Sequence, residues 1–102
     1  MALLYVTEFE SLAIPTEGGN APIANAPPVV DQSPVTIAGG ANKSAAFGTT
    51  TRFVRLHCDA ICSIAFSATG TAATASNMRM PASHTEYFGV RPGFYVSVIT
   101  NT

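Results

Sequence analysis

The chain has 102 residues, of which 47% are hydrophobic and 11% are charged, with five Lys and Arg against six Asp and Glu. This length corresponds to one small domain. The balanced charge argues against nucleic-acid binding, because counterion release needs several clustered cations. No run approaches the roughly 20 apolar residues that cross a bilayer. We therefore expect neither nucleic acid nor a membrane among the partners.

The low charge also bears on the surface. An ordinary soluble domain is about 25% charged, so Ala, Thr, Ser, Gly and Asn must cover much of this one. A weakly hydrated surface of this kind suits packing against another protein, and a free monomer with a Thr/Ser/Ala-rich exterior is the alternative. The first residues lack the basic segment of a signal peptide, so we expect synthesis in the cytoplasm.

Residues 1–34 are predicted to form an extended amino-terminal arm. Residues 3–6 read Leu-Leu-Tyr-Val, which fits a short strand or a segment that adds itself to a neighbour's sheet. Residues 15–34 contain five prolines, each of which fixes φ and removes a backbone donor. A helix or a central strand is therefore not expected there. The apolar residues of this stretch favour an arm lying on a surface, and a flexible linker is the alternative. Deletion of residues 1–34 is then expected to leave a folded body.

Residues 35–102 are predicted to form that body, from short strands separated by turn residues. Residues 51–58 show the clearest alternation, with Val54, Leu56 and Cys58 on one face and Phe53, Arg55 and His57 on the other. The Asp59-Ala60 turn predicts a hairpin between residues 51–58 and 61–67. Further strands are expected over residues 35–37, 44–47, 77–80, 85–90 and 94–100, with Met78 and Met80 pointing inward.

The last of these strands is apolar on both faces, which indicates a central strand of a sandwich or a strand covered by a partner. The chain shows no long segment with helical periodicity. The pattern predicts an all-β fold: a small antiparallel β-sandwich or barrel, jelly-roll-like, with an extended Pro-rich amino-terminal arm.

Cys58 and Cys62 are the residues closest to a chemical motif. With His84 they could form a zinc site, but structural zinc sites usually use tighter spacing such as C-x-x-C. Both cysteines fall on the predicted core face, so we interpret them as small buried hydrophobic residues. A disulfide across the hairpin is the other alternative, which a cytoplasmic origin disfavours.

The remaining candidate chemistries lack support in the sequence. A catalytic cysteine needs a partly exposed, electropositive setting, and Cys58 and Cys62 do not have one. No G-x-S-x-G elbow is present, and Gly18-Gly19 and Gly39-Gly40 do not precede helices as a phosphate loop would. We predict a protein that is not an enzyme and has no catalytic residues, no cofactor and no metal site.

The segment from Thr51 to Ile99 resembles small virion proteins of tailed bacteriophages, in particular capsid cement or decoration proteins. The residues that carry the resemblance are Met80-Pro81, Glu86-Tyr87-Phe88-Gly89-Val90, Gly93 and the final apolar strand over residues 96–99. The resemblance covers about half the chain and rests on turn and strand residues. It implies a β-sandwich body with an extended arm, a place in the virion, and homo-oligomers, of which a trimer is favoured.

The resulting hypothesis is a non-enzymatic structural protein of a phage particle that stabilises contacts between capsid subunits. Its expected partners are the major capsid protein or another virion protein. The alternatives are a tail, connector or fibre component of the virion, and a ligand- or carbohydrate-binding β-sandwich. The residues expected at the protein interface are Leu3, Leu4, Tyr5, Val6, Pro22, Ile23, Val29, Val30, Tyr87, Phe88 and Tyr95.

Overall fold

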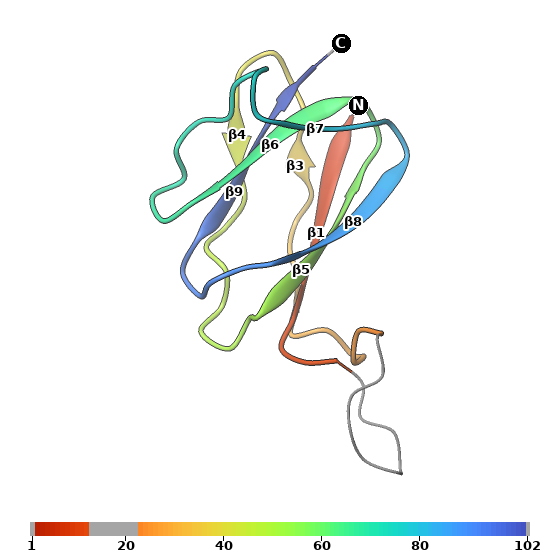
Figure 1. Cartoon of the computed structure of the whole chain (residues 1–102), viewed down its shortest axis with the longest axis vertical. Helices are drawn as coiled ribbons and strands as arrows, with labels where there is room; N and C mark the ends of the chain where they lie inside the picture. The colour runs from red at the N-terminus through yellow and green to blue at the C-terminus, as the bar shows by residue number, and fades with distance from the viewer. Residues whose placement is uncertain (1, 13–22, 102) are drawn as a thin grey trace.

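The computed structural model of the chain describes residues 2–12 and 23–101. These residues form two antiparallel sheets packed face to face (Figure 1), and no helix among them could span a membrane. The strands are β1 (Leu3–Phe9), β2 (Val30–Asp31), β3 (Val35–Thr36), β4 (Asn42–Lys43), β5 (Phe53–Cys58), β6 (Cys62–Ser67), β7 (Met78–Met80), β8 (His84–Gly89) and β9 (Tyr95–Thr100). The predicted all-β sandwich is confirmed.

Strand pairing divides the chain into two layers. In the first sheet the order is β2-β1-β5-β8. β3 pairs with the first half of β1, on the same side on which β2 pairs with its second half. In the second sheet the order is β4-β9-β6-β7. Every pair is antiparallel. β8 therefore lies at one edge of the first sheet, with β2 and β3 at the other, and β7 and β4 lie at the two edges of the second sheet.

The core lies between the two sheets and follows the alternation of the strands. On β5, Val54, Leu56 and Cys58 are fully buried, as predicted, and their neighbours Phe53, Arg55 and His57 are only partly buried. β1 and β9 contribute further buried side chains from either layer, and Phe47 reaches the core from the loop before β5. A side-chain period of two places alternate residues inside the sandwich, and this apolar burial is the main stabilising contribution to the fold.

The predicted hairpin between residues 51–58 and 61–67 is wrong. β5 pairs with β1 and β8 in the first sheet, whereas β6 pairs with β7 and β9 in the second. Three residues, Asp59 to Ile61, connect the layers. An extended segment of three residues reaches about 10 Å, which matches the usual spacing of about 10 Å between packed sheets. A connection short enough for a hairpin can therefore also cross the sandwich.

The amino-terminal segment also differs from its prediction. Residues 3–9 form β1, which lies between β5 on one side and β2 and β3 on the other. This strand belongs to the body and not to an arm, so the expected boundary after residue 34 does not separate two structural parts. β2 lies within the Pro-rich stretch. Neighbouring prolines are compatible with this short strand because it lies at the edge of the sheet and pairs only with β1. Residues 13–22 lie outside the described residues.

Two smaller expectations also need correction. Met78 lies on the same face of β7 as the buried Met80, as predicted, but it is 51% exposed, because β7 is an edge strand and no further strand of the described residues covers its free side. Residues 44–47 do not form a strand, and the neighbouring strand is β4. The apolar final strand, by contrast, is central as predicted: β9 lies between β4 and β6. The loop after β6 covers the face of β9 that points away from the core, where the Ala73 amide donates to Ser97 Oγ at 2.9 Å.

Candidate interaction face

The outer face of the first sheet is the candidate functional surface. We use "outer face" for the side chains of the three long strands of this sheet that point away from the second sheet. The register places these side chains in cross-strand rows, since partners in a sheet project from the same side. The members are Leu3, Tyr5, Thr7 and Phe9 from β1, Phe53, Arg55 and His57 from β5, and Thr85, Tyr87 and Gly89 from β8.

Aromatic rings line this face. The rings of Phe9 and Phe53 stack with their centroids 5.2 Å apart, and the ring of Tyr87 lies 6.4 Å from that of Phe53 in a tilted arrangement. Such pairs contribute more than their buried area alone. Tyr87 is 55% exposed, and it lies at the border of the outer face because β8 is an edge strand.

A second row carries polar atoms beside an aromatic ring. The centroids of Tyr5 and His57 are 6.3 Å apart. His57 Nδ1 lies 2.8 Å from the hydroxyl oxygen of Thr85, so the two form a hydrogen bond. Arg55 carries the only formal charge among the outer-face residues, and it lies between Thr7 and Tyr87 in the cross-strand register. The face thus combines aromatic rings with a few polar side chains and one central cation.

A groove opens at the end of this face, where β8 finishes. Its volume is about 440 Å³, and it is lined by Leu12, Ile23, Ala24, Phe53, Tyr87, Phe88 and Gly89. The segments that bear Leu12 and Ala24 meet through an isolated β-bridge. The groove is therefore formed jointly by the sheet and by the two short segments that flank residues 13–22. Its apolar lining fits a large apolar side chain.

The structure brings several of the expected interface residues to this face. Tyr5 and Tyr87 are exposed on it, Leu3 lies on it partly buried, and Ile23 lines the groove at 62% exposure. Val29 and Val30 are also exposed, at the β2 edge of the same sheet. Phe88 points to the inner side of β8, where its ring lies 5.2 Å from that of Phe66.

Other expected interface residues lie elsewhere. Leu4 and Val6 are fully buried in the core of this chain, so they cannot contact a partner of the folded domain. Tyr95 lies on β9, and Lys43 Nζ lies 4.7 Å from its ring centroid. Pro22 is outside the described residues. Phe53 and His57 were not expected at the interface, although their alternation opposite the core residues of β5 was the signal that could have indicated them.

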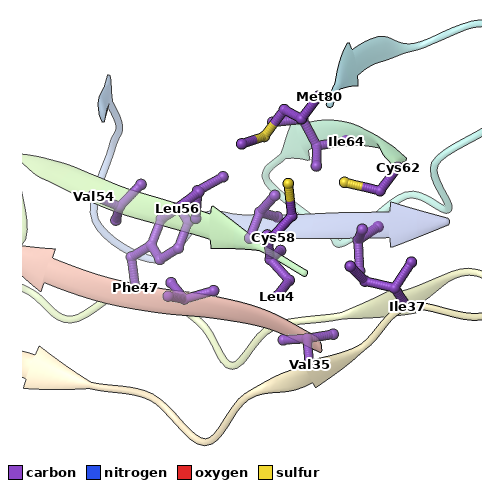
Figure 2. Close-up of a cluster of buried hydrophobic side chains, with 13 residues drawn as sticks. Leu4, Val35, Ile37, Phe47, Val54, Leu56, Cys58, Cys62, Ile64 and Met80 are labelled. Atoms are coloured by element: carbon purple, nitrogen blue, oxygen red, sulfur yellow. The ribbon is translucent and has the colours of Figure 1, made fainter. Parts of the chain in front are cut away.

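The two cysteines are core residues with little reactivity. Both are free and buried, and Figure 2 shows them close together in the core, Cys58 on β5 and Cys62 on β6. Cys58 Sγ donates to the carbonyl oxygen of Pro81 at 2.9 Å. Burial, together with the neighbouring Cys58, raises the pKa of the Cys62 thiol to about 12. A thiol with this pKa is protonated at neutral pH, and the thiolate is the nucleophile and metal ligand.

Glu8 is the buried carboxylate of the described chain, and its oxygens are occupied by the protein itself. Oε1 accepts hydrogen bonds from Thr51 Oγ1 at 2.6 Å and from the Gly48 amide at 2.8 Å. Oε2 accepts from Gln32 Nε2 at 2.7 Å. A carboxylate with three donors on it is a structural link between β1 and two loops. Among the described residues, no group of three His, Cys, Asp or Glu side chains could hold a metal ion.

Comparison with known proteins finds no family model, no curated protein and no solved structure that matches this chain.

Proposed function

We propose that this chain is a non-enzymatic structural protein of a bacteriophage particle, a capsid cement or decoration protein that binds the major capsid protein. The observation that carries the proposal is the exposed aromatic outer face of the first sheet. Exposed apolar patches on small domains mark interaction sites, and Tyr and Arg are enriched at protein interfaces. The outer face offers Tyr5 and Tyr87 beside Arg55 on a rigid sheet.

The expected stabilisation of the shell is the sum of many small contributions from docked side chains. Complete burial of a large apolar side chain contributes roughly 1.5–3 kcal/mol. Tyr5 and Tyr87 are 39% and 55% exposed, so each can contribute a part of that amount on docking. A shell contains many equivalent sites, and a modest gain at each of them stabilises the whole particle.

The resemblance to phage virion proteins supports the same surface. The residues that carry it end β7, make up much of β8 and form the turn before β9. Within that segment, Tyr87 and Gly89 belong to the outer face and border the groove. The proposed protein acts in the virion after synthesis in the host cytoplasm, and it acts as a homo-oligomer, with a trimer favoured. A tail, connector or fibre component would use the same face in a ring or fibre.

One observation favours a second candidate, a carbohydrate-binding domain. The row formed by Tyr5, His57 and Thr85 places an aromatic ring beside hydrogen-bonding side chains on an open face. An aromatic ring next to polar groups is a chemically suitable platform for a sugar ring. This candidate predicts saturable binding of soluble glycans that is lost in Tyr5→Ala.

Co-sedimentation with expanded phage capsids tests the main proposal. The chain is expected to pellet with shells at a fixed ratio, and Tyr5→Ser/Tyr87→Ser is expected to weaken binding by about tenfold or more. Tyr95→Ser is the matched control, because this tyrosine lies on β9 in the second sheet. Light scattering gives the oligomeric state in parallel. A stable monomer that does not bind any shell would overturn the proposal.

A further inference from the structure

β8 has an unpaired side that differs from the other free edges of the described chain. It is the last strand of the first sheet and has six residues. The remaining edge strands are short: β2, β3 and β4 have two residues each, and β7 has three. Very short edge strands are one way in which proteins prevent sheets from joining. β8 lacks this protection.

The hydrogen-bond pattern shows which backbone groups of β8 are free. The Val90 amide donates to the Arg52 carbonyl at 2.9 Å, and Val54 lies opposite Phe88 in the register. In an antiparallel pair, every second residue bonds to its partner strand and the residues between them point the other way. The amides and carbonyls of Thr85, Tyr87 and Gly89 therefore face away from β5, where no strand of the described residues pairs with them.

Apolar pockets flank β8 on both sides of the sheet near Gly89. The groove on the outer face is lined partly by Phe53, Tyr87 and Gly89. A second cavity of about 240 Å³ lies on the inner side, lined by Phe66, Met78, Phe88, Gly89, Val90, Arg91 and Phe94. Successive side chains of a strand point to opposite faces. A strand laid along β8 would thus place one side chain in each pocket.

A second copy of this chain fits the edge poorly. Consider two copies of β8 paired antiparallel, with the two Tyr87 residues opposite each other. Thr85 of one chain would then lie opposite Gly89 of the other, on the outer side, and His84 would be the adjacent residue on the inner side. A hydroxyl and an imidazole would then approach the two apolar pockets. Thr85 is hydrogen-bonded to His57, and His84 lies beside Glu86 within the same chain. These side chains therefore offer little apolar surface for the pockets to bury. Gly89 itself leaves open space, since a Cβ built on it would meet no atom within 4 Å.

We propose that the free edge of β8 binds an extended segment of a partner protein, which adds a strand beside residues 85–89. The segment has two adjacent large apolar residues, one for each pocket, and acidic residues flanking them. The acidic flanks follow from the exposed Arg52 and Arg91 beside Gly89 and from Arg55 on the outer face. In this mode of recognition, main-chain hydrogen bonds supply affinity and the alternate pockets supply specificity. The inference rests on the proposed function only for the identity of the partner as a capsid protein.

Amide hydrogen exchange with a synthetic peptide tests the edge directly. The probe is an acetylated octapeptide of Thr and Glu residues with Phe next to Leu at its centre. In the free chain, we expect β5 to protect the amides of Glu86 and Phe88, whereas those of Thr85, Tyr87 and Gly89 should exchange rapidly. The peptide is expected to slow exchange at these three amides by about tenfold or more at saturation.

A matched peptide sets the specificity. It has the same composition, but one Thr separates Phe from Leu, so both large side chains point to one face and only one pocket is filled. Its affinity is expected to be at least about tenfold lower. Unchanged exchange at the three amides with the first peptide at millimolar concentration, or equal binding of the two peptides, would overturn the inference.

Two variants connect the edge to the assembly. Gly89→Val fills the outer groove with a residue that strands favour, and Gly40→Val is its control because a Cβ at Gly40 also meets no atom within 4 Å. Thr85→Pro removes an outward amide without removing a bond to β5, a position that edge strands tolerate. Thermal unfolding of each variant shows that it folds before binding is measured.

The outcomes separate this inference from the proposed function. Shell binding that is lost in Gly89→Val and retained in Gly40→Val supports both. Shell binding unaffected by Gly89→Val and Thr85→Pro overturns the edge inference and leaves the cement function standing. Peptide binding at the edge without any shell binding supports the inference and overturns the proposed function.

Discussion

The carboxylate of Glu8 accepts a 2.6 Å hydrogen bond from the hydroxyl of Thr51, across 43 positions of the sequence. Both residues are at most 1% exposed. The bond connects the central strand β1 to the turn that leads into β5, and the Gly48 amide donates to the same oxygen. These two hydrogen bonds hold the end of β1 against the start of β5, where Phe9 and Phe53 of the outer face lie opposite each other.

Removal of this hydroxyl should destabilise the fold. Thr51→Val keeps the shape of the side chain but leaves Glu8 without one of its donors, and a hydrogen bond to a charged group contributes about 1.5–3 kcal/mol. We expect the free energy of unfolding, measured with urea, to fall by that amount. Thr51→Ser keeps the hydroxyl and should lose less than half as much. Equal losses in the two variants would show that the hydroxyl is not responsible.

Stability should fall at alkaline pH because of Cys62. Its pKa is about 12 in the folded chain against 9.0 for the ordinary thiol, so between these values the unfolded chain has lost a proton that the folded chain keeps. The stabilising effect is present in full below pH 9 and declines by about 1.4 kcal/mol per pH unit above it. Urea unfolding at a series of pH values measures the slope, and Cys62→Ala should reduce it by this amount. A slope that does not change would contradict the assignment.

Gly93 should not tolerate a side chain. Its φ is +81°, in the turn between β8 and β9, and its amide donates to the Phe47 carbonyl at 2.8 Å. A residue with a Cβ costs about 1–2 kcal/mol in this left-handed region. Gly93→Ala is expected to lower the thermal midpoint accordingly. Gly40→Ala is the control, since Gly40 lacks a positive φ and a Cβ there meets no atom; similar midpoints for both variants would contradict the strain argument.

Deletion of residues 1–34 should unfold the protein rather than leave a body. The deletion removes β1 from the middle of the first sheet, together with Leu4, Val6 and the carboxylate of Glu8. β5 would lose its longest partner on that side, and the core would be open to water. Circular dichroism and amide dispersion in NMR spectra should show an unfolded chain. A cooperative, folded fragment of residues 35–102 would contradict the placement of β1.

Alternation along single strands was readable from the sequence. On β5 it separated the buried Val54, Leu56 and Cys58 from the outward Phe53, Arg55 and His57, because a strand has a period of two wherever it lies. Burial of both cysteines followed from the same pattern. The all-β class and the exposure of Tyr5 and Tyr87 could also be expected. These properties depend on local geometry and on the polarity of each residue.

The choice of partner strands was decided only by the tertiary structure. A three-residue connection fits a hairpin and a crossing between sheets equally well, so residues 51–58 gave no indication that β5 pairs with β1 and β8 instead of β6. The burial of Glu8 and the placement of Leu4 and Val6 in the core depend on that long-range pairing. The outer face and the free edge of β8 arise the same way, because they bring together residues from β1, β5 and β8 that no local pattern connects.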